Sequence, residues 1–420
     1  MAGRTPPSGR LNRWGDLYEK LETSKQTRRR TVQMSLYKSS SGREVNDLSY
    51  SAISDYDYCP ELFRLSRIEG YRDKEKRAAF QFGNCVESGI QFYHENGLKP
   101  GDGIDEFKRL WLKFKDVTLV FTEQEGCWFD LLGMGADLLR LYEIALPTLP
   151  IKNPKFQLNY RKDLWPGTEL AGLGFTSYID ILSTLDDGSR LIIDVKTAKS
   201  PLDSTPGLLA LDPQLKDYAW ATGIRDVAFL WLIKGRPSFK KGDSVTLLVD
   251  TLDFKAGTSL TVAKFAAPKE DSSGIILLAT EEIVRKMDEE LDAISGKGAT
   301  EKKEQVLAKY LCDGKLCSVG RDSITKTRLQ FLTARIPEKE LPETGQHIGS
   351  RLIQIKEAVR TNFFPKTGGV RYPNTKCPNC RMRGLCLDRP DLVEKLLVKS
   401  GPKPKKEEED DWLKELEEVE

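Results

Sequence analysis

The alternation of apolar and polar positions over residues 172–200 predicts a β-hairpin. Two runs of apolar and β-branched residues flank residues 186–188 (Asp-Asp-Gly), and Asp-Gly between such runs is a strong signal for a tight turn. A turn centred near position 187 places Asp180 and Asp194 opposite each other, to within one residue, because each lies seven residues from that centre. Side chains alternate along a strand, so Asp194 and Lys196 share one face. The hairpin therefore brings two carboxylates and one amine to a single patch.

Apolar residues at helical spacing predict helices on both sides of this hairpin. The expected helices cover residues 54–68, 75–94, 102–115, 128–146, 280–294, 347–363 and 392–398. Another helix begins after the N-cap candidate Asp212 and ends at Gly223. Within the second helix, Gly83 predicts a close approach of a backbone or a ligand, and Glu87 lies one turn later on the same face. Glu87 is either a boundary residue that meets water or a metal ligand aimed at the sheet.

Further strands are expected over residues 156–160, 227–234, 246–252 and 259–265. Together with the hairpin they give an α/β core, which we expect to be a central mixed β-sheet flanked by helices. Its predicted extent is 49–390, with a poorly placed insertion near 236–345. Residues 296–345 are polar and irregular, and the pattern does not place their elements. Residues 1–48 are rich in Arg, Ser, Gly and Pro and predict a basic, mostly disordered arm. Residues 391–420 predict a short helix and an acidic tail.

Composition and charge narrow the class of protein. The chain of 420 residues has 65 basic and 63 acidic side chains, so its net charge of +2 neither demands nor excludes nucleic acid. No run reaches the roughly 18 apolar residues that cross a bilayer, and the first ten residues lack the apolar core of a signal peptide. We therefore expect an intracellular, cytoplasmic protein without a membrane partner. The last fourteen residues are strongly acidic and predict a solvated tail, a docking peptide for a basic protein partner, or an internal mimic of DNA.

The paired carboxylates of the hairpin predict a divalent-metal site. Like charges opposite one another on a sheet are destabilising unless a cation lies between them. Mg²⁺ and Mn²⁺ prefer hard oxygen ligands, and either ion can support phosphodiester hydrolysis. In isolation, Asp194 and Lys196 more often form a surface ion pair. Asp180 at the matching position, with Gln214 and Tyr218 on one face of the following helix, makes the combination much more specific.

In this order, the residues resemble the RecB-like branch of the PD-(D/E)XK nucleases. The resemblance rests on Gly83 with Glu87, Ile179-Asp180, Ile193-Asp194-Val195-Lys196, and Gln214 with Tyr218. It implies a restriction-endonuclease-like core around the mixed sheet. One departure is that the family's helical ligand is usually a His, whereas position 87 is Glu. A carboxylate suits Mg²⁺ and Mn²⁺, so this departure bears on metal preference more than on hydrolysis.

The resemblance also implies a role for each residue. The implied metal ligands are Glu87, Asp180, Asp194 and the carbonyl oxygen of Val195. The implied catalytic residues are Asp180, Asp194 and Lys196, and the implied DNA contacts are Gln214 and Tyr218. Lys199 is a basic residue near the site that could hold backbone phosphates, independently of any resemblance.

Four cysteines form a second group of candidate ligands. Cys377, Cys380 and Cys386 have a two-then-five spacing, and Cys59 precedes Pro60 far upstream. Three soft ligands near each other need a fourth for a tetrahedral or cubane site, and spacing alone does not separate iron–sulfur from zinc. The context of Cys59 resembles the opening cysteine of AddB-type and CRISPR-associated RecB-like nucleases. This implies a 4Fe-4S cluster that staples the N-terminal helix to the C-terminal region, with unligated thiols as the alternative.

Taken together, the two groups of residues favour a metal-dependent DNA nuclease. We expect a deoxyribonuclease that is an exonuclease rather than an endonuclease, acts on single-stranded DNA or DNA ends, and serves recombination, replication or repair. A prokaryotic or phage-infected cell would suit such an enzyme. The alternative is a catalytically inactive nuclease fold that binds DNA or docks a partner and keeps a structural iron–sulfur or zinc site.

Overall fold

A computed structural model describes most of the chain between residues 35 and 400. The described residues are 35–122, 125–165, 168, 170–234, 239–266, 275–296, 298–320, 323–325, 328–367, 369–370 and 376–400. Most of the predicted basic arm and all of the acidic tail after residue 400 lie outside these residues. Among the described helices, none combines the length and the apolar composition needed to cross a membrane.

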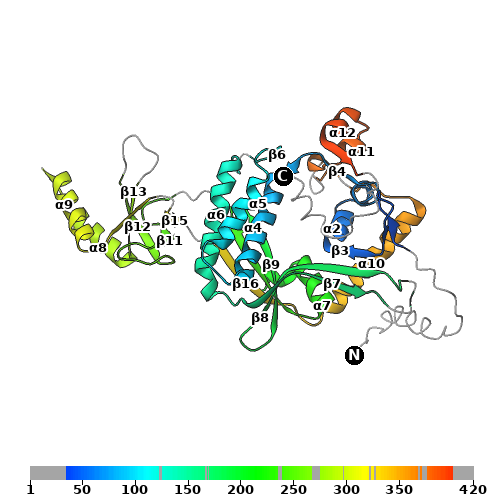
Figure 1. Cartoon of the computed structure of the whole chain (residues 1–420), viewed down its shortest axis with the longest axis horizontal. Coiled ribbons are helices and arrows are strands. Elements are labelled where there is room, and N and C mark those ends of the chain that lie inside the picture. The colour runs from blue at the N-terminus through cyan, green and yellow to red at the C-terminus, as the bar shows by residue number, and fades with distance from the viewer. Residues whose placement is uncertain are drawn as a thin grey trace, which may run out of the picture.

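A six-stranded mixed sheet forms the centre of the molecule, which confirms the predicted α/β class (Figure 1). Its strands are β3 (Asp47–Ser49), β7 (Lys152–Asp163), β8 (Gly174–Thr184), β9 (Arg190–Ala198), β10 (Asp226–Ile233) and β16 (Leu329–Arg335). The order is β16-β10-β9-β8-β3, and β7 also pairs with β8. β9 and β10 are parallel, as are β3 and β8, whereas the other pairs are antiparallel. The predicted hairpin therefore supplies two adjacent strands in the middle of the sheet.

Helices cover the sheet on both faces. On one face lie α4 (Ala78–Glu95), α5 (Asp102–Leu112) and α6 (Trp128–Ala145), and on the other lies α7 (Pro213–Thr222), with α2 (Tyr50–Tyr58) and α10 (Glu340–Thr361) nearby. Phe82 and Val86 of α4 pack in one core with Ile193 of β9. Leu215 of α7 packs in another core with Ile192. Successive residues of β9 thus point into opposite cores, as side-chain alternation requires.

The helix predicted over residues 54–68 is interrupted at Cys59. α2 begins earlier than predicted, because the Ser49 hydroxyl accepts a hydrogen bond from the Ala52 amide at 3.4 Å and caps the helix. Cys59 has an extended conformation with φ −168°, and α3 (Pro60–Phe63) and a π-helical turn (Arg64–Ile68) follow. Proline disfavours a helical conformation in the residue before it. This local effect sets Cys59 apart between two helices.

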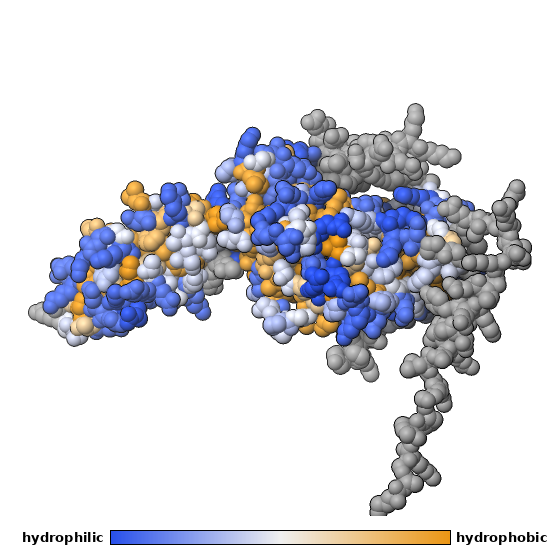
Figure 2. Space-filling view, turned by 90° about the horizontal axis from the view of Figure 1, so that it is seen from below, coloured by the Kyte–Doolittle hydropathy of each residue, from blue (hydrophilic) through white to orange (hydrophobic). Residues whose placement is uncertain are grey.

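A separate lobe is inserted between two neighbouring strands of the central sheet. β10 and β16 are antiparallel partners, yet the chain between them forms a second, five-stranded sheet in the order β14-β13-β12-β11-β15. The elements of this lobe are β11 (Ser244–Leu247), β12 (Ser259–Ala266), β13 (Ile275–Ala279), α8 (Glu281–Asp292), α9 (Ala299–Cys312), β14 (Cys317–Gly320) and β15 (Ile324–Thr325). The lobe projects from the body (Figures 1 and 2). The insertion predicted over 236–345 is therefore too long, because β16 and the start of α10 belong to the body.

Short strands, helices and turns complete the described fold. These are β1 (Tyr37–Lys38), β2 (Glu44–Val45), β4 (Tyr71–Asp73), β5 (Lys76–Arg77), β6 (Leu119–Val120), α11 (Arg383–Cys386), α12 (Pro390–Leu396) and β17 (Leu397–Lys399), with 3-10 turns at Leu146–Thr148, Leu208–Leu211 and Cys377–Asn379. β17 pairs with β4, which joins the C-terminal segment to the N-terminal one. β1 and β2 form a hairpin, and Leu36 and Leu48 are buried. Residues 35–48 are thus ordered, because their apolar side chains reach the core, unlike the disordered arm predicted there.

Candidate active site

The hairpin of β8 and β9 places two carboxylates opposite each other. Its turn closes through the amide of Leu185, which donates to the carbonyl oxygen of Ser189 at 2.8 Å, and Gly188 has φ +81°. The last regular pair before the site is Ile181 with Ile193. The same register, continued by one residue, sets Asp180 opposite Asp194. This is the arrangement that the Asp-Gly turn predicts.

Asp180 replaces a ladder hydrogen bond where the two strands separate. Its Oδ2 accepts a hydrogen bond from the Val195 amide at 2.8 Å. The carboxylate is therefore fixed to β9 one residue beyond Asp194. A backbone donor of this kind favours the charged form of a carboxylate, although burial acts in the opposite direction here.

Asp194 is fully buried and is held by three side chains. Lys196 Nζ lies 2.5 Å from Asp194 Oδ2, an ion pair that does not meet the angles of a hydrogen bond. Gln214 Nε2 donates to Asp194 Oδ1 at 2.9 Å, and the Tyr218 hydroxyl donates to the same oxygen at 3.4 Å. Burial raises the pKa of Asp194 to about 7, against the lowering influence of Lys196. Burial therefore makes the charged form of Asp194 more costly than that of a free aspartate.

Glu87 reaches the site from helix α4. The helix approaches β9 closely at Gly83, where a Cβ atom would lie 3.3 Å from Thr197 Oγ1. One turn later, Glu87 interacts with Asp180. Burial, and next the charge of Glu87, raise the pKa of Asp180 to about 7. Burial also raises the pKa of Glu87 itself. The close approach predicted from the glycine is therefore what brings the third carboxylate to the hairpin.

The three carboxylates fit a divalent cation by their chemistry. They supply hard oxygen donors, and the raised pKa values of Asp180 and Asp194 reflect negative charges that are buried close together. Among the residues that the structure describes, no three His, Cys, Asp or Glu side chains are already arranged around a metal position. The carboxylate oxygens are instead held by protein donors, including Lys196 and the Val195 amide. A cation would have to displace some of these contacts.

The residues predicted to contact DNA lie in different surroundings. Tyr218 is only 4% exposed, and its hydroxyl faces Asp194. Gln214 is partly buried and donates both to Asp194 and to the Tyr218 hydroxyl, the latter at 2.6 Å. Lys199 is exposed at the end of β9, and its Nζ donates to Thr122 Oγ1 at 3.2 Å. In this arrangement, Gln214 and Tyr218 support the carboxylate, and Lys199 is the predicted contact that faces solvent.

Two residues near the site were not predicted from the sequence. Gln157 of β7 donates a hydrogen bond from its Nε2 to Glu87 Oε1. Tyr50, the first residue of α2, interacts electrostatically with Lys196 and Asp194. A lone Gln in a strand and a Tyr at a helix start carry no motif, so only the tertiary contacts reveal them.

The four predicted cysteine ligands lie in one region. All four are partly buried, and none of them forms a disulfide bond: Cys59, Cys377, Cys380 and Cys386. Cys59 interacts electrostatically with Cys380 and Cys386, and Cys377 interacts with Cys380. Lys376 fixes the two ends of the chain together, because its Nζ donates to the Tyr58 carbonyl oxygen at 2.8 Å, and its own carbonyl oxygen accepts from the Tyr58 hydroxyl at 2.8 Å. Thiolates can bind either an iron–sulfur cluster or zinc, but among the residues that the structure describes no three of these thiols are arranged around a metal position.

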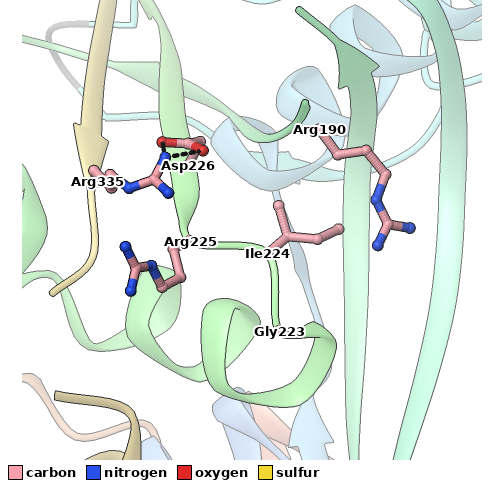
Figure 3. Close-up of a pocket in the computed structure, with 6 residues that line it drawn as sticks. All are labelled: Arg190, Gly223, Ile224, Arg225, Asp226 and Arg335. Carbon is pink, nitrogen blue, oxygen red and sulfur yellow. Dashed lines mark hydrogen bonds and ion pairs between the residues drawn. The ribbon is translucent and has the colours of Figure 1, made fainter. Parts of the chain in front are cut away.

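A pocket of about 230 Å³ lies away from the carboxylates (Figure 3). It is lined by Arg190, Gly223, Ile224, Arg225, Asp226 and Arg335, at the starts of β9 and β10. Arg335 is paired with Asp226 at 2.7 Å, and Arg225 is paired with Glu338 at 2.8 Å. The predicted site residues do not line it, and its arginine charges are largely balanced by these acids.

One of three comparisons with known proteins identifies a family for this chain. No curated protein matches the chain. The crystal structure of SSO0001 is similar over 46% of this chain and 64% of that chain, with 14% sequence identity and a TM-score of 0.20, so the chain spans less than two thirds of that protein. A family model described as the PD-(D/E)XK nuclease superfamily matches residues 47–387. This match begins at the first strand of the central sheet, includes all three C-terminal cysteines and covers most of the chain. The chain therefore belongs to the PD-(D/E)XK nuclease superfamily.

Proposed function

We propose that the protein is a metal-dependent DNA nuclease, an exonuclease rather than an endonuclease, that acts in recombination, replication or repair. The observation that carries this proposal is the convergence of Glu87, Asp180 and Asp194 beside Lys196, within a chain of the PD-(D/E)XK superfamily. Buried carboxylates of this kind are costly unless they serve a function. The RecB-like features of the sequence favour DNA as the substrate.

The carboxylates would hold Mg²⁺ or Mn²⁺ together with the carbonyl oxygen of Val195. Such an ion supplies charge neutralisation at the scissile phosphate and lowers the pKa of an attacking water. Asp180 is kept in place by the Val195 amide, and Glu87 is delivered by α4. Burial raises the pKa of both carboxyl groups, so they become better ligands as the pH rises.

Lys196 would provide the positive charge beside the reacting phosphate. Its side chain is 37% exposed, whereas its partner Asp194 is fully buried, so the ammonium group borders solvent and can meet a substrate. Burial lowers the pKa of Lys196, but Asp194 and Asp180 raise it by more, so the net shift is upward. Lys196 therefore holds its proton and acts as a hydrogen-bond donor to a water or a phosphate oxygen, not as a base.

Gln214 and Tyr218 would orient Asp194, and Lys199 would bind the DNA backbone. The first two donate to one oxygen of Asp194, which leaves the other oxygen for Lys196 or a cation. The burial of Tyr218 favours this supporting role over the direct DNA contact implied by the resemblance. Lys199 is exposed just after the end of β9, the strand that carries Asp194, and suits a phosphate contact.

The four cysteines would hold a 4Fe-4S cluster, with zinc as the alternative occupant. Their proximity joins the segment after α2 to the segment around α11, and the cluster would act as a structural staple. Purified protein that is brown and contains about four irons per chain would support the cluster. A colourless protein with one zinc per chain would support the alternative.

Cleavage of end-labelled DNA tests the proposed activity. Wild-type protein should degrade single-stranded or double-stranded DNA in Mg²⁺ or Mn²⁺, and a ladder that shortens from one end would identify an exonuclease. Asp194→Ala and Lys196→Ala should lose cleavage while circular dichroism and the metal content of the cysteine site stay unchanged. Full activity in both variants would falsify the mechanism. Wild-type protein that binds DNA but never cleaves it would favour an inactive DNA-binding module.

A further inference from the structure

β7 has an unusual backbone conformation at one residue beside the carboxylates. Gln157 has φ +50°, in the left-handed region that non-glycine residues rarely adopt. Its neighbours Phe156 and Leu158 pair regularly with β8, and the same register puts Gln157 opposite Asp180. The irregularity therefore falls on the residue that faces a proposed metal ligand.

Packing on both sides of the sheet imposes this conformation. In a regular strand, residues two apart point to the same face. Phe156 packs against the core beneath α4, whereas Leu158 packs against the core beneath α7. On β8, Ile181 and Ile179 divide between the same two cores. Both strands thus change faces at the level of Gln157, and the surrounding cores stabilise a backbone conformation that is unfavourable by itself.

The side chain of Gln157 reaches helix α4. Its Nε2 donates a hydrogen bond to Glu87 Oε1, across 70 positions of sequence, and Glu87 in turn interacts with Asp180. An amide donates without adding charge, so it orients the carboxylate without competing electrostatically with a cation. The strand conformation that places Gln157 opposite Asp180 thus also fixes the third carboxylate.

We propose that Gln157 is a positioning residue that holds Glu87 in place for metal binding. The proposal rests on the proposed metal site and extends it to a residue outside the sequence motifs. Partners that orient metal ligands typically change metal affinity or activity by about 10–100-fold when they are removed. The left-handed backbone of Gln157 then serves to direct its side-chain amide toward Glu87. Replacement of Gln157 should therefore weaken metal binding without lowering the stability of the fold.

Gln157→Gly tests this separation directly. Glycine adopts φ +50° without strain, so the variant should unfold at the same temperature as the wild type or higher, while it lacks the amide. We expect its affinity for Mn²⁺, titrated calorimetrically without DNA, to fall by about 10-fold or more. DNA cleavage should then need more Mn²⁺, with the KM for DNA little changed. Gln157→Asn tolerates the same backbone but is one methylene shorter, and it should show the same loss.

Asn153→Gly is the matched control, because Asn153 is the other exposed left-handed residue of β7, with φ +44°. It should bind Mn²⁺ as the wild type does. Unchanged Mn²⁺ affinity in both Gln157 variants would overturn the positioning role, even if the wild type cleaves DNA. If the Gln157 variants bind Mn²⁺ more weakly but the wild-type protein never cleaves DNA, the positioning role stands and the nuclease proposal is rejected.

Discussion

The carboxylate site and the cysteine group are built in different ways. Asp180 and Asp194 lie on adjacent strands, and the helices that carry Glu87 and Gln214 pack on opposite faces of the same sheet. The cysteines lie instead in a break between helices and in short turns, from segments more than 300 positions apart. The first group is supported by regular elements and two cores. The second depends on contacts such as those between Tyr58 and Lys376.

This difference predicts which property of the protein the loss of each group would affect. The carboxylates lie on strands and a helix that two cores support, so their loss should affect chemistry more than folding. The small cluster of buried side chains beside the cysteines includes Leu62, Leu65 and Met382. A core of this size stabilises weakly, so a metal or cluster that joins its segments would contribute directly to folding. This comparison would be contradicted if a carboxylate variant lost stability, or if a cysteine variant lost cleavage without losing stability.

The largest effect is expected for Asp180→Asn. Asparagine can still accept the hydrogen bond from the Val195 amide, so the hairpin should keep its register, but the charge for the cation is lost. We expect cleavage to fall by about 10³-fold or more, with a melting temperature within about 2 °C of the wild type. A large drop in melting temperature would show that this carboxylate is structural and would remove the contrast between the two regions.

Cys59→Ser should instead lower the stability of the fold. It removes one of four soft ligands, and we expect the melting temperature to fall by about 5 °C or more, with loss of bound iron or zinc. Limited proteolysis should open the pairing of β4 with β17 before the central sheet unfolds. Cys312→Ser, at an exposed thiol of the inserted lobe, is the control and should change neither property. Equal behaviour of the two variants would argue that the four cysteines hold nothing.

A smaller, pH-dependent effect is expected for Asp217, which lies between the two regions on α7. Burial raises its pKa to about 8, with further contributions from Asp212 and Asp57. The folded state therefore holds this proton more tightly than the unfolded state. The resulting stabilisation is complete below about pH 4 and is lost as the pH rises through about 8.

Urea unfolding at pH 5 and pH 8.5 checks this sign. The stability advantage of Asp217→Asn over the wild type should grow by about 4 kcal/mol between the two pH values. Asp203→Asn, at a fully exposed acid, should show no such growth. A variant advantage that is constant with pH would mean that Asp217 is already charged at pH 5.

The sequence alone determined those features that depend on neighbouring residues. An Asp-Gly turn fixes the centre of the hairpin, and strand alternation then fixes the relation of Asp180, Asp194 and Lys196. In the same way, the Asp212 side chain caps α7 by accepting from the Leu215 amide at 3.0 Å. The predicted mixed sheet with flanking helices follows from the same periodicities.

Only the tertiary structure decided the features that depend on packing between distant segments. The strand β16 was not predicted, because its partner β10 is separated from it by a whole lobe. Gln157 carries no signal in its own neighbourhood, since its role comes from strands that change faces between two cores. The family resemblance implies a DNA contact for Tyr218, and the packing of α7 on the sheet directs its hydroxyl to Asp194. Local periodicity specifies an element and its faces, whereas the burial of those faces selects which side chains meet.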